Sequence, residues 1–282
     1  MSVYDARGSA ISTFYDVSGN VIQRCFGADG TELTQNGYDL VVMTFNVKWF
    51  QGINAQLDMM EEIFSTYVPD LIGIQEAPNS LSGSIPSALF SGYRWQYLIN
   101  DSNDDAILSK NIRFFDIVKV NYTTQAIENK YYTKCRFRWR EKTICWINTH
   151  VVHKRTAEAI STRIAQMQEL LAVAETEDYV IITGDMNTGA MSMDAEEWIG
   201  TYKPFIDAGY NLSNCDTRWG FTKTYSAETS AESLDDFTYP TDNIITSGDI
   251  DIVNRIIDTT KLSYQNGSVI DHVPVIAYLK IN

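Results

Sequence analysis

The sequence lacks any apolar run long enough to cross a membrane, since none approaches the ~20 residues that a bilayer requires. It also lacks, at its start, the basic residues followed by an apolar core that mark a standard signal peptide. These two absences predict a protein without a transmembrane segment. They also predict a protein that is cytoplasmic, or exported by another route.

Positive charge and cysteine are scarce as well. The net charge of -14 excludes a broad basic surface for gripping nucleic acid, although a bound divalent cation can supply positive charge at a phosphate. Basic residues gather only at positions 130–142, where we expect the solvated face of two strands. The four cysteines have no zinc-finger spacing and are too few for a disulfide scaffold.

The length of 282 residues allows one large domain, alone or with a small appendage. The first 33 residues hold an 11-residue repeat, in which Tyr4–Ile11 recurs at 15–22 and more loosely at 26–33. Each unit is an aromatic, a Gly-centred turn and an aliphatic, a pattern typical of small β-hairpins. We therefore predict an appendage at 1–36 and a main body at 37–282. The appendage is expected to attach to its own domain, to a partner or to a second chain.

Five short apolar runs in the body predict strands buried on both faces. Each run adjoins polar residues suited to a metal or a phosphate, which are Asn46, Gln75–Glu76, Asn148–His150, Asp185–Asn187 and Asp271–His272. Polar groups gathered at strand ends can form one active site on a rigid scaffold.

Two amphipathic segments between these runs predict helices at 55–67, capped by Asn54, and at 156–176. Helices that alternate with strands favour a layered α/β fold. The spans 79–104 and 211–241 are rich in Ser, Gly and Asn, so we expect surface loops there.

Seven short motifs follow one another in a specific order: TFNV, DLIGIQEA, AILSK, INTHVVH, ITGDMN, TDNIITS and IDHVPV. In this order they resemble the endonuclease/exonuclease/phosphatase superfamily, the fold of pancreatic-type deoxyribonuclease, over residues 39–282. The resemblance implies a four-layered α/β sandwich of two packed, mostly antiparallel β-sheets flanked by helices. It also implies hydrolysis of a phosphate ester with Mg²⁺ or Mn²⁺.

The resemblance also implies roles for single residues. Glu76, Asn46 and Asp271 are expected to bind the metal, and a hard dication does prefer oxygen ligands. Asp185 and Asn187 are expected to handle the attacking water. Asn187 lies two residues beyond Asp185, so in an extended segment both would point to the same face.

His150 and His272 are expected to bind the phosphate oxygens. Asp242 is expected beside one of them, where a carboxylate raises the pKa of the imidazole and orients it. The alternatives are purely structural roles, in which Asp242 caps a turn after Pro240 and Asn46 only ends a strand. His153 is expected on the surface.

The match has two departures. Asp104–Asp105 stands where many members have a tyrosine or a glycine–asparagine pair, and Lys130 stands where nuclease-like members have an arginine. Lys130 is therefore a candidate substrate-binding residue. Both departures concern the identity of the substrate rather than the class of reaction.

A nuclease is the favoured function. The alternative is a phosphoesterase that acts on a lipid headgroup, as in sphingomyelinases, or on a small phosphorylated metabolite. The acidic composition favours this alternative, whereas the lack of an apolar docking stretch counts against a lipid. An inactive binding module is disfavoured because the set of acids, amides and histidines is intact.

Overall fold

The structure is a computed structural model. It describes residues 37–47, 60–77, 105–110, 112–125, 128–225, 239–258 and 271–282, together with the course of the backbone at 2–4, 10–15, 21–26, 32–33, 53–59 and 95–99. Within these residues, no helix is both long enough and apolar enough to cross a bilayer.

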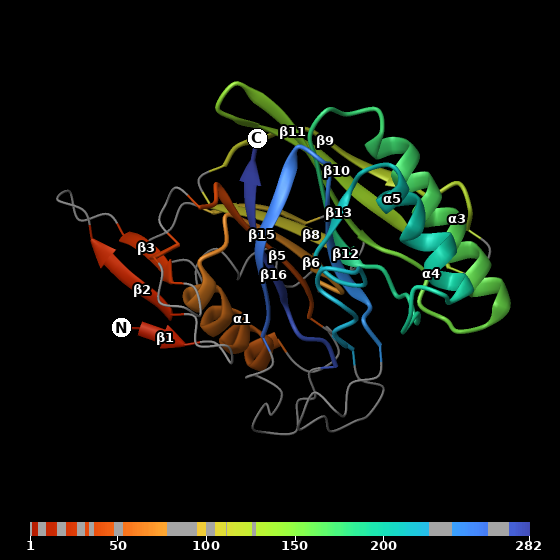
Figure 1. The fold of residues 1–282 in the computed structure, drawn as a ribbon, viewed down its shortest axis with the longest axis horizontal. Coiled ribbons are helices and arrows are strands. Elements are labelled where there is room, and N and C mark those ends of the chain that lie inside the picture. Colours follow the sequence, from red (N-terminus) through yellow and green to blue (C-terminus); the bar gives the residue numbers. More distant parts are fainter. Residues whose placement is uncertain are drawn as a thin grey trace.

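Two six-stranded sheets form the centre of the body (Figure 1). The strands of the first are β9 (Phe114–Asn121), β10 (Tyr131–Trp139), β11 (Lys142–His150), β12 (Val180–Asp185), β13 (Asn211–Leu212) and β14 (Asp242–Thr246). The strands of the second are β5 (Leu40–Asn46), β6 (Leu71–Gln75), β7 (Trp95–Ile99), β8 (Asp105–Lys110), β15 (Ile250–Ile257) and β16 (Val275–Ile281). Their orders are β13-β14-β12-β11-β10-β9 and β15-β16-β5-β6-β8-β7.

Helices cover the outer face of each sheet. Helix α1 (Ile53–Tyr67) lies on the side of the second sheet, and α3 (Ala157–Ala174), α4 (Glu196–Thr201) and α5 (Lys203–Asp207) lie on the side of the first (Figure 1). Three apolar cores fill the spaces between these layers, one between the sheets and one beneath each helical layer. The predicted four-layered sandwich is therefore confirmed.

The helix boundaries agree with the sequence to within a few residues. Thr156 caps α3, because its hydroxyl accepts a hydrogen bond from the Ala159 N–H at 3.2 Å. Helix α1 begins at Ile53, so Asn54 lies inside the helix and not before it.

Each sheet is antiparallel except for one parallel pair at its centre, which is β5–β6 in one sheet and β11–β12 in the other. A crossover helix, α1 or α3, links each pair. Parallel strands end at the same edge of a sheet, and here Asn46 is paired with Gln75 and His150 with Asp185. Four of the five polar strand ends thus meet at one edge of the sandwich.

A buried polar cluster joins the two sheets behind this edge. The Asn148 side chain accepts hydrogen bonds from Gln75 Nε2 at 2.7 Å and Thr183 Oγ1 at 2.9 Å, and donates to the carbonyl of Ile74 at 3.1 Å. A Cβ on Gly73 would lie 2.2 Å from both Asn148 Oδ1 and Thr183 Oγ1. Glycine is therefore required where the sheets approach, and Asn148 and Gln75 hold the sheets together instead of facing a substrate.

Two predicted loop regions contain packed structure. The span 79–104 includes the edge strand β7, which is built from the β-favouring run Trp95–Ile99, so the expectation of loops was wrong there. The span 211–241 begins with β13 and continues through the buried residues Ser213, Asn214 and Cys215. The remainder of the first span, and 226–238 of the second, lie outside the described residues.

The N-terminal repeat forms a small sheet of its own. Its strands are β1 (Ser2–Tyr4), β2 (Ala10–Tyr15), β3 (Val21–Phe26) and β4 (Glu32–Leu33), paired antiparallel in that order. The predicted β-hairpin arrangement is confirmed in these strands, while the Gly-centred turns lie outside the described residues. The division at residue 36 into appendage and body stays a prediction.

Several of the basic residues at 130–142 pair with the protein's own acids. Arg136 pairs with Asp116 at 3.0 Å and also with Glu177, which lies 3.2 Å from Lys134. Arg140 pairs with Asp39 at 2.7 Å. The paired cations therefore do not form a free basic face. Of the residues expected on a solvated face, Arg138 and Arg140 are exposed, whereas Lys130 is buried.

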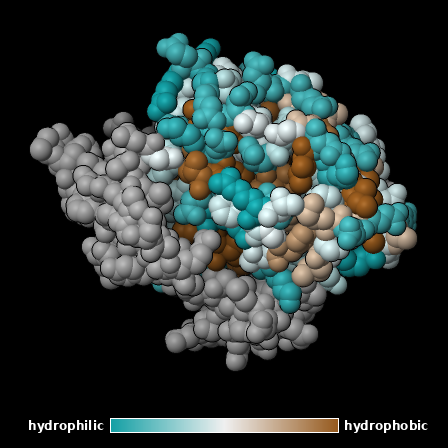
Figure 2. Space-filling model, in the orientation of Figure 1, coloured by the Kyte–Doolittle hydropathy of each residue, from teal (hydrophilic) through white to brown (hydrophobic). Residues whose placement is uncertain are grey.

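The described part of the surface mixes hydrophilic and hydrophobic side chains on the face drawn in Figure 2. The exposed large apolar side chains come from different elements and are Ile117, Val118, Met191, Ile199 and Val253. The buried cysteines Cys135, Cys145 and Cys215 are free thiols.

Candidate active site

The side-chain amide of Asn46 joins the two sheets at the site edge. Its Nδ2 group donates to Glu76 Oε1 at 3.2 Å and to Asp185 Oδ2 at 3.0 Å. Asn46 ends β5, Glu76 follows β6 and Asp185 ends β12. Asn46 therefore binds one carboxylate from each sheet. It does more than end strand β5, which was the alternative interpretation.

Asp185 is 1% exposed and lies between the two predicted histidines. Its Oδ2 atom is 3.6 Å from Nε2 of His150 and 3.6 Å from Nε2 of His272. Burial alone would raise the pKa of Asp185, but the two histidines and the Asn46 and Asn187 hydrogen bonds hold it below its usual range. Asp185 is therefore a carboxylate at neutral pH.

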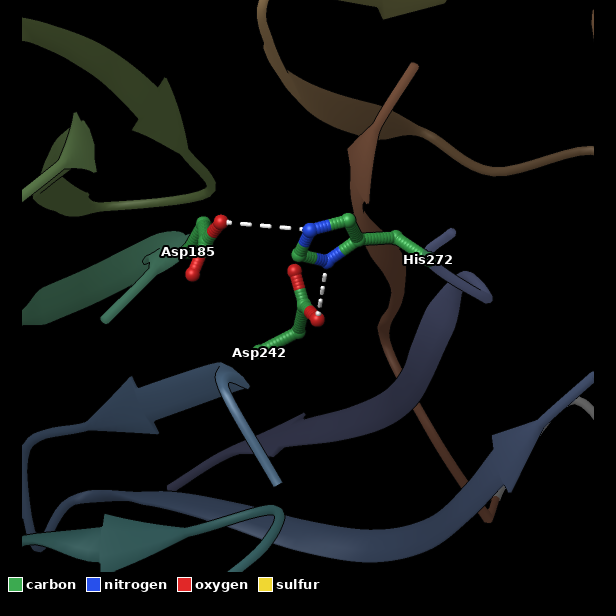
Figure 3. A group of neighbouring side chains, drawn as sticks. All are labelled: Asp185, Asp242 and His272. Atoms are coloured by element: carbon green, nitrogen blue, oxygen red, sulfur yellow. Dashed lines mark hydrogen bonds and ion pairs between the residues drawn. The ribbon is translucent and has the colours of Figure 1, made fainter. Parts of the chain in front are cut away.

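His272 is held between two carboxylates from the first sheet (Figure 3). Its Nδ1 atom lies 2.9 Å from Asp242 Oδ2, which also accepts from Thr241 Oγ1 at 2.9 Å. Burial alone would lower the pKa of His272, but Asp242 and Asp185 raise it to about 10. The ring is therefore an imidazolium at neutral pH, with one N–H directed at each carboxylate.

Glu76, Asn46 and Asp271 offer only oxygen ligands, which suits Mg²⁺ or Mn²⁺. Burial and the nearby carboxylates of Asp271, Asp185 and Glu76 raise the pKa of Tyr225. The charge of each of these three acids therefore acts on the Tyr225 phenol. The predicted metal ligands fit this chemistry, although their role stays a prediction.

A second set of three ligand atoms also lies close together. Asp185, Asp242 and His272 place these atoms within 4.8 Å of one another. An imidazolium has no free lone pair for a cation, and both of its nitrogens face carboxylates. This trio is better suited to orienting a proton donor than to binding a metal.

Asn187 has a different conformation from the extended one expected. Its φ of 49° is left-handed, so the alternation of an extended segment does not apply. Its backbone N–H donates to Asp185 Oδ1 at 2.9 Å, while its side chain donates to the carbonyl of Val151 at 3.1 Å. In this structure Asn187 supports the Asp185 carboxylate chiefly through the backbone. Glu76 is also left-handed, with a φ of 55°.

Lys130 and Asp105 occupy buried positions near strand ends. Lys130 precedes β10, and its Nζ atom lies 3.8 Å from Glu128 Oε2. Asp105 is paired with Gln75 at the start of β8, and Asp104 lies outside the described residues. The predicted contact of Lys130 with substrate stays a prediction. His153 is exposed and lies 2.9 Å from Glu128 Oε2, as expected for a surface residue.

Three residues of this region were missed by sequence reasoning. The Tyr225 ring centroid lies 4.9 Å from that of His272, and Arg155 donates to the carbonyl of Asn187. The guanidinium of Arg155 also lies 4.3 Å from the ring centroid of Tyr239. The only signal available was proximity, since Arg155 follows the INTHVVH motif and Tyr239 precedes Asp242 by three residues.

The layered sheets and helices form a DNase I-like fold. The acids, amides and histidines at its edge are those expected of a phosphoesterase with this fold. The family model described as "Endonuclease/Exonuclease/phosphatase family" matches residues 43–258, and the chain belongs to this family. Members of the family are hydrolases. No curated protein matches the chain in sequence.

Solved structures are similar over most of the chain. A Bacteroides vulgatus endonuclease/exonuclease/phosphatase has a TM-score of 0.68 at 13% identity, covering 86% of this chain and 99% of that one. The catalytic domain of human Nocturnin with bound sulfate has 0.65 at 16%, covering 87% and 94%. The Bacteroides thetaiotaomicron mannosyl-6-phosphatase Bt3783 has 0.61 at 13%, covering 86% and 99%. At these identities the similarity concerns the fold.

Proposed function

We propose that this protein hydrolyses phosphodiester bonds with Mg²⁺ or Mn²⁺, through attack of water at phosphorus. The observation that carries the proposal is the buried Asp185 carboxylate, with Oδ2 3.6 Å from Nε2 of both His150 and His272. A proton acceptor and two potential donors to phosphate oxygens thus share one site. These are the groups that hydrolysis of a phosphodiester needs.

Glu76, Asn46 and Asp271 would hold the divalent cation. When bound, the cation supplies positive charge that offsets the charge of the phosphate. The protein contributes carboxylate oxygens from the ends of different strands, and Asn46 keeps Glu76 close to Asp185. The shared amide would therefore hold a metal-binding carboxylate in a fixed relation to the proton acceptor.

Asp185 would accept a proton from the attacking water. Its lowered pKa makes it a weak base at neutral pH, so the site must position the water for a partial proton transfer. His272, protonated and held by Asp242, would donate from Nε2 to a non-bridging oxygen. His150 reaches the same carboxylate from β11 and would contact the phosphate from the other side.

Nucleic acid is the substrate that we propose first. A small phosphorylated metabolite is the second candidate, and one observation favours it: Lys134 and Arg136 on β10 are paired with Glu177 and Asp116. The two candidates differ in salt dependence. A nucleic acid held through several phosphates gives a steep loss of kcat/KM with salt, whereas a small ester gives a shallow one.

The proposal is tested by turnover with Mg²⁺, with Mn²⁺ and with EDTA. The substrates are plasmid DNA, abasic duplex, RNA, sphingomyelin, inositol phosphates, a sugar phosphate and bis-p-nitrophenyl phosphate. We expect metal-dependent release from a diester. Full activity in EDTA would contradict the metal requirement, and turnover of monoesters alone would contradict the diester assignment.

The Asp185→Asn variant tests the role of the carboxylate. It keeps the size of the side chain but removes the proton acceptor, so we expect loss of turnover with substrate binding retained. Binding is measured separately, by fluorescence anisotropy of a labelled substrate. The exposed Asp178→Asn serves as a control. Turnover by Asp185→Asn within ~10-fold of wild type would leave a histidine as the proton acceptor.

A further inference from the structure

Two loops follow the parallel strands β11 and β12 and are bonded directly to each other. The Val151 N–H donates to the carbonyl of Asp185 at 3.1 Å, and Asn187 Nδ2 donates to the carbonyl of Val151 at 3.1 Å. The guanidinium of Arg155 donates to the carbonyl of Asn187. Asn187 is therefore held by its side chain and by its backbone carbonyl.

The conformation of Asn187 determines the environment of Asp185. The Asn187 N–H turns back onto Asp185 Oδ1 at 2.9 Å, and Asn187 itself is left-handed at a φ of 49°. Asparagine tolerates this region better than most residues, but the conformation still needs support from its surroundings. The cationic donor on the carbonyl of Asn187 supplies such support.

Arg155 is itself held in place by several groups. Its guanidinium lies 4.3 Å from the ring centroid of Tyr239 and 4.0 Å from Glu197 Oε1. Glu197, on α4, also accepts from the Gly189 N–H at 2.9 Å and from Nε of Arg163 at 2.6 Å. Arg155 is thus held from α4, with the Tyr239 ring as a further support.

The same network fixes the loop that carries Arg155. Arg163 is fully buried on α3 and donates to the carbonyl of Val152, while Gln166 Oε1 accepts from the Val152 N–H at 3.1 Å. The loop is therefore tied to the helix that connects β11 to β12. Helix α3 is a structural support for the site as well as a cover for the sheet.

We propose that Arg155 is a positioning residue for Asp185. By holding the carbonyl of Asn187, it keeps the Asn187 N–H on Oδ1, which leaves Oδ2 facing His150 and His272. The proposal rests on the proposed function, in which Asp185 accepts the proton of water. The alternative is direct contact of Arg155 with substrate, since 33% of its side chain is exposed.

Two kinds of change separate position from charge. Arg155→Met removes the donor, and Arg155→Lys keeps the charge but loses the planar fork. Gly189→Ala keeps every charge, yet its Cβ would lie 3.0 Å from Arg155 Nη1 and 3.3 Å from Glu197 Oε2. Arg140→Met is the matched control, because Arg140 pairs with Asp39 at 2.7 Å beyond the opposite end of β11.

The first measurement is steady-state kinetics on bis-p-nitrophenyl phosphate with Mn²⁺. We expect kcat to fall by ~10²-fold in Arg155→Met, the scale of a misplaced catalytic group, with KM unchanged. Arg155→Lys and Gly189→Ala should fall less, and Arg140→Met should match wild type. A rise in KM at constant kcat would make Arg155 a substrate contact and overturn the proposal, as would no change at all.

The second measurement does not depend on activity. We expect the Asn187 amide to exchange slowly with solvent in wild type and faster in Arg155→Met, as followed by NMR. A fall in kcat with unchanged Asn187 exchange would overturn the positioning role. If Arg155→Met fails to fold, kcat and Asn187 amide exchange in Arg155→Lys and Gly189→Ala test the positioning role instead. If wild type turns over no substrate, the proposed function fails, and the amide exchange alone tests the hold on Asn187.

Discussion

At the scale of single residues, the site depends on which atoms face one another across two sheets. One amide hydrogen-bonds to the acid proposed for metal binding and to the acid proposed for proton transfer. Neither carboxylate can move far without breaking a bond to Asn46. The metal half and the proton-accepting half of the site are therefore coupled.

Glu76 is the residue through which we expect the metal to bind. Replacing Glu76 with Ala removes a carboxylate at the site edge, so metal affinity should weaken and kcat should fall at least ~10²-fold. Isothermal titration with Mn²⁺ measures the affinity. The exposed Glu141→Ala, in the turn before β11, is the control. Unchanged metal affinity in Glu76→Ala would refute the assignment.

Gly73 tests the contact between the sheets behind the site. A Cβ there would lie 2.2 Å from Asn148 Oδ1 and Thr183 Oγ1, so Gly73→Ala must break buried hydrogen bonds or separate the sheets. We expect a loss of at least ~2 kcal/mol in the free energy of unfolding, measured in urea. Gly189→Ala, whose Cβ would meet only the ends of the Arg155 and Glu197 side chains at 3.0 Å or more, should cost much less. Equal stability of the two variants would contradict this packing.

The sequence located the chemical groups of the site better than their orientation. Asp185, His150 and His272 converge as predicted because they lie at strand ends, which topology brings together. The polar residue Asn148, two residues before His150 on β11, faces the other sheet instead. Alternation along a strand does not reveal which polar residue is buried. The left-handed turn of Asn187 had no signal either, because it depends on a contact from another loop.

At the scale of elements, each parallel pair with its crossover helix delivers two groups to the same edge. The apolar runs predicted these strands because strands buried on both faces have little choice of composition. Strand β7 was missed because turn-forming residues surround it. The short helices α4 and α5 were not anticipated, and one of them carries Glu197. Short helices depend on tertiary packing, which local sequence does not encode.

The connection from α1 to β6 contains a pH-sensitive carboxyl group. Burial raises the pKa of Asp70 to about 6, against the Val41 hydrogen bond and the charge of Lys110. The folded state thus keeps this proton at a pH where the unfolded chain has lost it. The stabilising contribution is full below about pH 4 and is lost as the pH rises through about 6.

We expect Asp70→Asn to remove this loss. As the pH rises from about 4 to 7, the titration of Asp70 lowers the unfolding free energy of the wild type by at most about 3 kcal/mol. The variant lacks this carboxyl group, so its unfolding free energy should not fall for this reason. Urea unfolding across this range measures the difference, with the exposed Asp178→Asn as a control. Parallel curves for wild type and Asp70→Asn would show that Asp70 does not titrate in this range.

At the scale of the whole molecule, the catalytic layers and the N-terminal repeat are distinct in their strand pairing. Strands β1 to β4 pair only with one another among the described strands. The repeat was visible in the sequence because its 11-residue period is short. What the small sheet docks on is not encoded in that period, since docking depends on surfaces from elsewhere.

A truncated chain beginning at Gln35 tests whether the repeat is separable. We expect the body to fold and to turn over bis-p-nitrophenyl phosphate as the full chain does, because the described residues of its three cores all lie after residue 37. Turnover and the thermal midpoint are compared with those of the full chain. Insolubility of the truncated protein would show that the arm completes the core or an interface.

Chain order has a consequence for synthesis. Strand β16 inserts between β15 and β5, so the strand that carries the chain out of the site pairs with the first strand of the body. His272 lies just before it. A nascent chain still attached to the ribosome, with β16 in the exit tunnel, has no partner for that edge of β5 and lacks the imidazolium beside Asp185. The proposed site is therefore completed only after β16 has left the exit tunnel and paired with β5.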